Sequence, residues 1–231
     1  MEAIDRVTGE ASSTIGCSRT DAGVHANEYF FNFHTDSQIP ETRLVPALNA
    51  HLPYDIVVTS CKEVEESFHA RYCAVGKEYR YLIHNSFVRD PFSENRKYHY
   101  RYPLDEKLMH RAAQSFVGTH DFSAFCSAGS TVKDTVRTIT YANVSREEDL
   151  VVFTVRGTGF LYNMVRIMVG TLLAVAEGKL GEQDIPEIIQ SGDRNRAGVT
   201  APAHGLYLNR VFYDPQEFEM TPGGEKNVNN H

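Results

Sequence analysis

The sequence lacks several features that mark specialised classes of protein. Its 231 residues include four cysteines and no C-x-x-C pair, which argues against a zinc site or a disulfide framework and fits a reducing cytoplasm. The longest apolar stretch, residues 160–176, is interrupted by Asn163 and Arg166, which argues against a membrane span. The opening stretch MEAIDRVTGEASS carries early acids and no apolar core, so we expect no secretory signal. A cytoplasmic protein is the resulting expectation.

The chain also lacks tryptophan and a net positive charge. Its formal net charge of -7 counts against a simple nucleic-acid binder. The charge is unevenly distributed, because residues 1–66 hold four Lys or Arg and eleven Asp or Glu, whereas residues 67–111 hold nine and five. The middle of the chain can therefore present a basic surface, although a solvated face of mixed charge is the simpler interpretation of charge alone.

Strand-like and helix-like segments are mixed without strict alternation. This mixture predicts an α+β fold with a largely antiparallel sheet. Runs rich in β-branched and aromatic residues predict strands at residues 29–33, 55–60, 79–84, 139–145, 150–156 and 206–213. Helical patterns lie at residues 41–50, 104–117, 160–177 and, more weakly, 183–190. The first residues resemble the end of a helix.

A compact polar cluster at residues 18–26 reads Ser-Arg-Thr-Asp-Ala-Gly-Val-His-Ala. The Asp and the nearby Gly favour a turn, from which the carboxylate of Asp21 can reach a cleft. Arg19 can lie close enough to keep that carboxylate ionised. For an isolated R-x-D-x-G pattern, a surface turn with a local ion pair is the simpler interpretation.

Other polar side chains are weaker candidates by themselves. Arg166 lies among apolar residues of a predicted helix, so it needs an anion, either a protein carboxylate or a phosphate. Tyr79 lies on a predicted strand, where a tyrosine is most simply a packing residue. The spacing of His25, His69 and His120 matches no metal-ligand motif, which favours structural or RNA-contact roles.

The polar cluster resembles the signature of the TruA family of tRNA pseudouridine synthases, which usually reads G-R-T-D-A-G-V-H-A. The match runs from Arg19 to Ala26, with Ser18 in place of the usual Gly. Further blocks resemble the family in its own order, at residues 68–71 with 77–81, 118–125, 159–166 and 205–208. The resemblance covers residues 1 to about 214.

The resemblance implies a role for each matching residue. Asp21 would be the catalytic carboxylate, with Arg166 paired to it and Arg19 nearby as further catalytic residues. Tyr79 would lie against the target base. The implied substrate is tRNA, at uridines 38 to 40 of the anticodon arm, and the implied assembly is a homodimer.

The resemblance also implies the domain organisation. Two ferredoxin-like halves, at residues 1–67 and 68–215, would share the sheet and enclose a central active-site cleft. The first half would carry the Asp21 loop and would be shortened at its start, because family members normally begin with an additional strand and a basic segment. Residues 216–231 are polar and Gly-rich, which predicts a disordered tail.

Pseudouridine formation breaks the bond from C1′ to N1, rotates the uracil and rejoins it through C5, so we expect no cofactor and no metal. An ionised Asp can attack C1′ or remove a proton at C2′, and the sequence leaves both routes open. The target base must leave its stack. Candidates for phosphate contacts are Arg71, Lys77, Arg80, Arg89, Arg101 and Arg137.

Two other functions remain open at the level of sequence. The shortened start allows a non-catalytic RNA-binding or RNA-folding helper that keeps the family's scaffold. A hydrolytic glycosidase is a weaker alternative, because such enzymes usually pair two carboxylates and no second one is evident.

Overall fold

The computed structural model of the chain describes residues 1–129 and 132–220. These residues form two compact units, one made of Met1–Arg19 with Tyr29–Ala74 and the other of Thr20–Glu28 with the chain from Val75 onward. The predicted halves, their boundary at residue 67 and the cleft between them stay predictions. At the start of the expected tail, Pro215–Glu219 forms a short helix, and residues 221–231 lie outside the described part of the chain.

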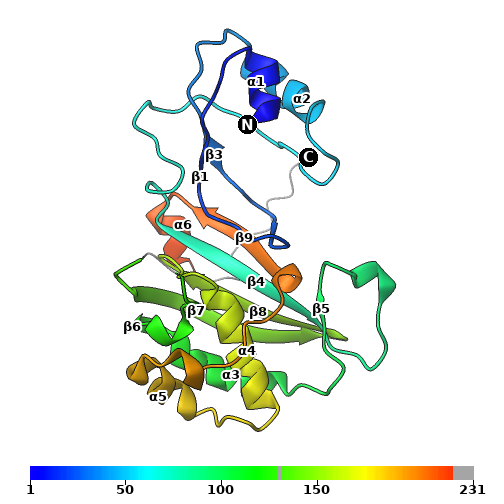
Figure 1. Ribbon diagram of the computed structural model, residues 1–231, viewed down its shortest axis with the longest axis vertical. Coiled ribbons are helices and arrows are strands. Elements are labelled where there is room, and N and C mark those ends of the chain that lie inside the picture. The colour runs from blue at the N-terminus through cyan, green and yellow to red at the C-terminus, as the bar shows by residue number, and fades with distance from the viewer. Residues whose placement is uncertain (130–131, 221–231) are drawn as a thin grey trace. The chain divides into compact units, whose positions relative to one another are not determined.

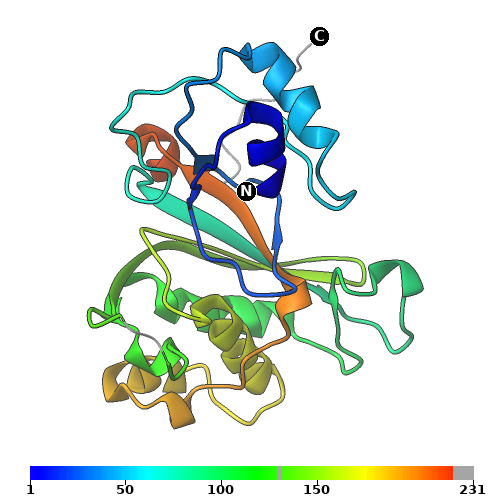
Figure 2. The same cartoon turned by 45° about the horizontal axis from the view of Figure 1, so that its top comes forward.

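The first unit is built around two helices that lie side by side (Figures 1 and 2). Its elements are α1 (Glu2–Thr8), β1 (Ile15–Gly16), β3 (Phe31–Asn32) and α2 (Glu41–Asn49). Apolar side chains of α1 and α2 form its small core, namely Ala3, Ile4, Leu44 and Leu48. Strands β1 and β3 pair antiparallel. The predicted helices at the start of the chain and at residues 41–50 are confirmed.

The strand predicted at residues 55–60 is wrong. That segment has no strand conformation. Its backbone bonds to an amide side chain, where the backbone of a strand would bond to a neighbouring strand. Asn49 donates through Nδ2 to the carbonyl of Val58 at 2.8 Å and accepts from the Val58 N–H through Oδ1 at 2.7 Å. Both backbone groups of Val58 are thus satisfied outside a ladder, which a pattern of β-branched residues does not reveal.

The second unit contains a seven-stranded sheet (Figure 1). Its strands are β2 (His25–Ala26), β4 (Gly76–His84), β5 (Tyr98–His99), β6 (Gly118–Asp121), β7 (Val136–Glu147), β8 (Leu150–Gly157) and β9 (Leu206–Phe212). The strand order is β2-β9-β4-β8-β7-β6, and β5 pairs with β4 outside this path. Only the β2–β9 and β4–β5 pairs of this sheet are parallel. The predicted α+β fold with a largely antiparallel sheet is therefore confirmed.

Helices cover one face of this sheet (Figures 1 and 2). They are α3 (Glu106–Ala113), α4 (Met164–Ala176) and α5 (Asp184–Ser191), while α6 (Pro215–Glu219) lies against β9. Short 3-10 turns complete the unit: η1 (Pro91–Ser93), η2 (Gln114–Phe116), η3 (Ser123–Phe125), η4 (Arg194–Arg196) and η5 (Ala203–Gly205). Cross-strand neighbours Tyr81, Phe153 and Val144 are buried on one face, so the sheet and helices share a core.

The helix predicted at residues 160–177 begins later than expected. Asn163 precedes it with a φ of 61°, a left-handed conformation that separates Phe160 and its neighbours from the helix. The resulting α4 carries ten buried residues, which agrees with its wide apolar stripe. In the described part of the chain, no helix is both long and apolar enough to cross a membrane.

Candidate active site

The predicted turn at Asp21 is present. The Asp21 carbonyl accepts a hydrogen bond from the N–H of Val24 at 3.0 Å, and Gly23 has a φ of 84°. A positive φ at the third position is what a type II turn requires, and glycine adopts it without strain. The turn leads directly into β2, which pairs with β9, and leaves the Asp21 side chain 38% exposed. The carboxylate is therefore positioned at the sheet edge and open to solvent.

Arg166 meets this carboxylate from the first turn of α4. Its Nη1 lies 3.4 Å from Oδ2 of Asp21 and donates to Oδ1 of Asn163 at 2.7 Å. Its Nε donates to the carbonyl of Ala201 at 2.7 Å. The Arg166 side chain is only 17% exposed, so its N–H groups need acceptors within the protein, and these oxygen atoms supply them. The anion that the sequence left undetermined is the carboxylate of Asp21.

Tyr79 lies in β4 and aligns across the sheet with Ala26, the last residue of β2. Leu208 of β9 is the register partner of both Tyr79 and Ala26. The Tyr79 ring is 7% exposed and meets the ring of Phe160 edge-on, with centroids 5.0 Å apart. Phe160 precedes α4, so the family blocks that contain Asp21, Tyr79 and Arg166 converge on this end of the sheet.

A β-bulge beside Tyr79 contains a buried polar cluster that the sequence did not reveal. The register changes between Glu78, opposite Arg210, and Tyr79, opposite Leu208, which leaves Asn209 as the extra residue. Asn209 donates through Nδ2 to Oε1 of Glu78 at 2.7 Å and accepts from Nδ2 of Asn27 at 2.9 Å. The bulge thus links β4 to the chain that follows the Asp21 turn.

Glu78 is also one half of a buried ion pair. Its Oε2 accepts from Nη2 of Arg156 at 2.9 Å and from Nε at 3.3 Å, and the two side chains are 3% and 5% exposed. Arg156 also donates to the carbonyls of Phe218 and Met220, and its guanidinium lies over the ring of Phe212. The signal available in the sequence was a charged residue at the edge of each strand-like run, since Glu78 directly precedes residues 79–84 and Arg156 ends residues 150–156.

The other predicted residues are placed as follows. Arg19 is exposed and belongs to the other unit, so its proximity to Asp21 stays a prediction. Among the candidates for phosphate contacts, Arg80 is exposed, and Arg101 lies over the rings of Phe87 and Tyr102 at 5.1 and 5.4 Å. Their contacts with RNA stay predictions.

The three histidines each have a local partner. His25 stacks on Tyr207 with centroids 4.6 Å apart, and His69 accepts the N–H groups of residues 71 and 72. Nε2 of His120 lies 3.1 Å from the carbonyl of Val117. No group of three or more His, Cys, Asp or Glu within the described ranges is arranged to hold a metal ion.

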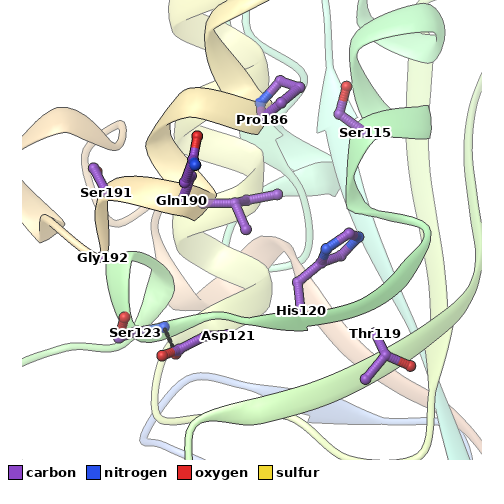
Figure 3. Close-up of a pocket in the computed structure, with 10 residues that line it drawn as sticks. Ser115, Thr119, His120, Asp121, Ser123, Pro186, Gln190, Ser191 and Gly192 are labelled. Atoms are coloured by element: carbon purple, nitrogen blue, oxygen red, sulfur yellow. Dashed lines mark hydrogen bonds between the residues drawn. The ribbon is translucent and has the colours of Figure 1, made fainter.

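A hollow of about 570 Å³ lies elsewhere in the second unit, between α5 and β6 (Figure 3). Its lining includes His120, Asp121, Ser123 and Gln190, but not Asp21, Tyr79 or Arg166. The Asp121 carboxylate in its wall accepts from the hydroxyl of Thr135 and the N–H of Ser123. Both bonds end on Oδ1 of Asp121, and they hold the carboxylate in the wall of the hollow.

The sequence of the chain is similar to those of known proteins over most of its length. A family model described as tRNA pseudouridine synthase matches residues 112–214. The chain is 54% identical over 211 residues to tRNA pseudouridine synthase A of Acetivibrio thermocellus, covering 91% of the chain and 86% of the relative. It is 48% identical over 213 residues to the protein of that name from Thermoanaerobacter pseudethanolicus, covering 92% and 87%. With this identity over most of both lengths, the chain belongs to the tRNA pseudouridine synthase A family.

Proposed function

We propose that the chain isomerises uridine to pseudouridine at positions 38 to 40 of the anticodon arm of tRNA, with Asp21 as the catalytic carboxylate. One observation carries the proposal: the partly exposed carboxylate of Asp21 faces the guanidinium of Arg166, which three acceptors hold in place. The relatives support the reaction class, since both are named tRNA pseudouridine synthase A.

Asp21 acts on the sugar of the target uridine. It either attacks C1′ as the N1 bond breaks, or removes a proton at C2′ to give a glycal. The uracil then turns and C5 bonds to C1′, either as the bond from Asp21 to C1′ breaks or, on the glycal route, as the proton returns to C2′. The proton on C5 is lost and N1 gains a proton, so that product and substrate are isomers. Both routes begin from an ionised carboxylate, and Nη1 of Arg166 lies 3.4 Å from Oδ2 of Asp21.

Tyr79 supplies an aromatic surface to the uracil after the base has left its stack. Its place beside the end of β2 puts the ring close to the Asp21 turn, and its edge-on contact with Phe160 limits its rotation. The ring is 7% exposed, so the base meets its accessible part, which the contact with Phe160 already holds in place.

The chain acts in the cytoplasm as a homodimer that binds tRNA through basic side chains. Arg80 and Arg101 are exposed, and Arg101 lies against aromatic rings that keep its guanidinium extended. The affinity for RNA should therefore fall steeply as salt is raised from 50 to 200 mM, by about 10³-fold if six phosphates are contacted. Filter binding checks this, and a flat response would contradict the phosphate contacts.

Replacement of Asp21 by Asn tests the catalytic proposal. The variant should lose pseudouridine formation in an anticodon-arm RNA by more than about 10³-fold, because an amide neither attacks C1′ nor removes a proton. RNA binding should stay within about threefold of wild type, because a neutral side chain adds no new repulsion to phosphates.

The control for this test is Asp149→Asn, at the exposed turn between β7 and β8, which should retain activity. Full activity of Asp21→Asn would contradict the assignment. A wild-type chain that binds the RNA but does not convert it would instead favour the non-catalytic helper.

A further inference from the structure

Arg166 is held at two points by the same residue. Its Nε donates to the carbonyl of Ala201 at 2.7 Å, and the N–H of Ala201 donates to the Arg166 carbonyl at 3.1 Å. The first bond orients the guanidinium, since a planar group bound through Nε has its Nη atoms in a fixed direction. That direction carries Nη1 to Asp21. The place of Ala201 therefore decides where the positive charge lies.

Ala201 belongs to residues 197–203, which we call the positioning segment. This segment also contacts two neighbours of the site. The Pro202 carbonyl accepts a hydrogen bond from the Tyr81 hydroxyl at 2.7 Å. A methyl group at Gly23, in the Asp21 turn, would lie 3.5 Å from the Cβ of Ala203. The segment thus contacts Arg166, the Asp21 turn and the strand that carries Tyr79.

The bond from Tyr81 is a stable feature of this arrangement. Burial raises the pKa of the Tyr81 hydroxyl, and the positive charge of Arg166 lowers it by a smaller amount. The hydroxyl consequently keeps its proton at neutral pH and donates a hydrogen bond to the Pro202 carbonyl.

Backbone contact brings the segment close to α4. A Cβ added at Gly170 would lie 1.8 Å from the carbonyl oxygen of Val199, and one added at Gly198 would lie 2.3 Å from the carbonyl carbon of Gly170. The N–H of Gly198 donates to the hydroxyl of Thr171 at 2.9 Å. The two glycines permit an approach that any side chain would prevent.

Apolar packing does little to hold the middle of the segment. Val199, its largest apolar side chain, is 76% exposed. Hydrogen bonds therefore contribute to its conformation together with the close approach of its backbone to α4, and one side chain supplies several of these bonds. Arg194 donates through Nη1 to the carbonyls of Gly198 at 2.9 Å and Ala197 at 3.4 Å, and through Nη2 to the hydroxyl of Thr200 at 3.2 Å.

We propose that Arg194 is a positioning residue for pseudouridine formation, which acts by fixing residues 197–203 so that Ala201 aims Arg166 at Asp21. Arg194 acts on Asp21 through the segment that contains Ala201 and then through Arg166. The inference rests on the proposed function, but the geometry that it describes can be tested without an activity assay.

The first test measures the hydrogen bond from Nε of Arg166 by NMR of the folded, nitrogen-labelled chain. The Nε–H signal that disappears in Arg166→Lys identifies the group. In Arg194→Ala its protection from exchange with water should fall by about tenfold or more, because the carbonyl of Ala201 no longer stays in place. Arg196→Ala is the matched control, since Arg196 lies two residues away and pairs on the surface with Glu187. Equal protection in Arg194→Ala and Arg196→Ala would overturn the inference.

The second test separates positioning from general stability by kinetics on an anticodon-arm RNA. Arg194→Ala should lower kcat by about 10- to 100-fold, as for a misplaced catalytic group, and leave KM within about twofold. In an Arg166→Lys background the same change should lower kcat by less than about twofold, because the aimed guanidinium is already absent. An equal loss in both backgrounds would overturn the inference.

A second variant and the exchange measurement decide the two cases in which Arg194→Ala or the wild-type chain gives no result. If Arg194→Ala does not fold, Thr200→Val removes one acceptor of Arg194, and a change in neither protection nor kcat would then overturn the inference. If the wild-type chain forms no pseudouridine, the proposed function fails, while the exchange measurement still decides whether Arg194 holds Arg166.

Discussion

Arg166 and Asp21 are 145 residues apart in the chain, and their side chains meet with Nη1 3.4 Å from Oδ2. The guanidinium reaches Asp21 while it also donates to Ala201 and Asn163. A planar group with several donors can satisfy these acceptors together, and a single ammonium group cannot. The pair therefore depends on the shape of arginine as well as on its charge.

Arg166→Lys should lower kcat by about 10- to 100-fold, since a positive charge remains but its direction is lost. Single-turnover conversion of an anticodon-arm RNA measures the effect. The control is Arg111→Lys, in an exposed pair with Glu182, for which wild-type rates are expected. Wild-type kcat in Arg166→Lys would show that charge alone suffices.

Tyr79→Leu should reduce activity by about 10- to 100-fold, in line with the loss of one base–aromatic stacking contact. Tyr79→Phe keeps the ring and its edge-on contact with Phe160, so its loss should be at least fivefold smaller than that of Tyr79→Leu. Activity of the two variants on one RNA checks the order. Equal losses would assign the role of Tyr79 to its hydroxyl instead.

The buried pair of Glu78 and Arg156 makes a prediction about stability. Glu78→Gln should lower the free energy of unfolding by about 3–5 kcal/mol, because it leaves the Arg156 charge buried without its partner. The double variant Glu78→Gln with Arg156→Met should recover part of this loss. Urea denaturation measures both, and a double variant less stable than Glu78→Gln would contradict the explanation.

The lowered pKa of the Asp121 carboxyl predicts that the stability of the protein depends on pH. The Thr135 hydroxyl and the N–H of Ser123 donate to its carboxylate and lower its pKa. A lowered pKa contributes stability above the ordinary value of Asp, and that stability is lost as the pH falls through the lowered value. Asp121→Asn should therefore lower Tm at pH 6, and the difference from wild type should shrink below about pH 3.5. Thermal melts check this, with Asp149→Asn as control.

Several elements could be predicted because their causes lie within a few residues. The turn at Asp21 follows from Gly23, the one residue in it that adopts a φ of 84° without strain. The apolar stripe of α4 and the aromatic and β-branched runs of β4, β8 and β9 likewise reflect local periodicity. The family blocks placed Asp21, Tyr79 and Arg166 as candidates before any contact was known.

Other features could not be predicted, because they depend on partners distant in the chain. Residues 55–60 have the composition of a strand, but the amide of Asn49 satisfies the backbone of Val58. The bulge at Asn209 exists only in the pairing of β4 with β9. Neither feature changes the local pattern from which strands are predicted.

The sequence by itself determined the α+β class, the family and the residues able to do the chemistry, because motif and periodicity are properties of neighbouring residues. The tertiary structure showed that Arg166 faces Asp21, as the resemblance implied, and it alone decided which residues aim Arg166. Asp21, Arg166 and Ala201 come from three distant segments, and their hydrogen bonds form only when the sheet and α4 have packed together. An arginine among apolar residues of a sequence indicates that its guanidinium has an acceptor in the folded protein. The packing of distant segments decides which acceptor it is.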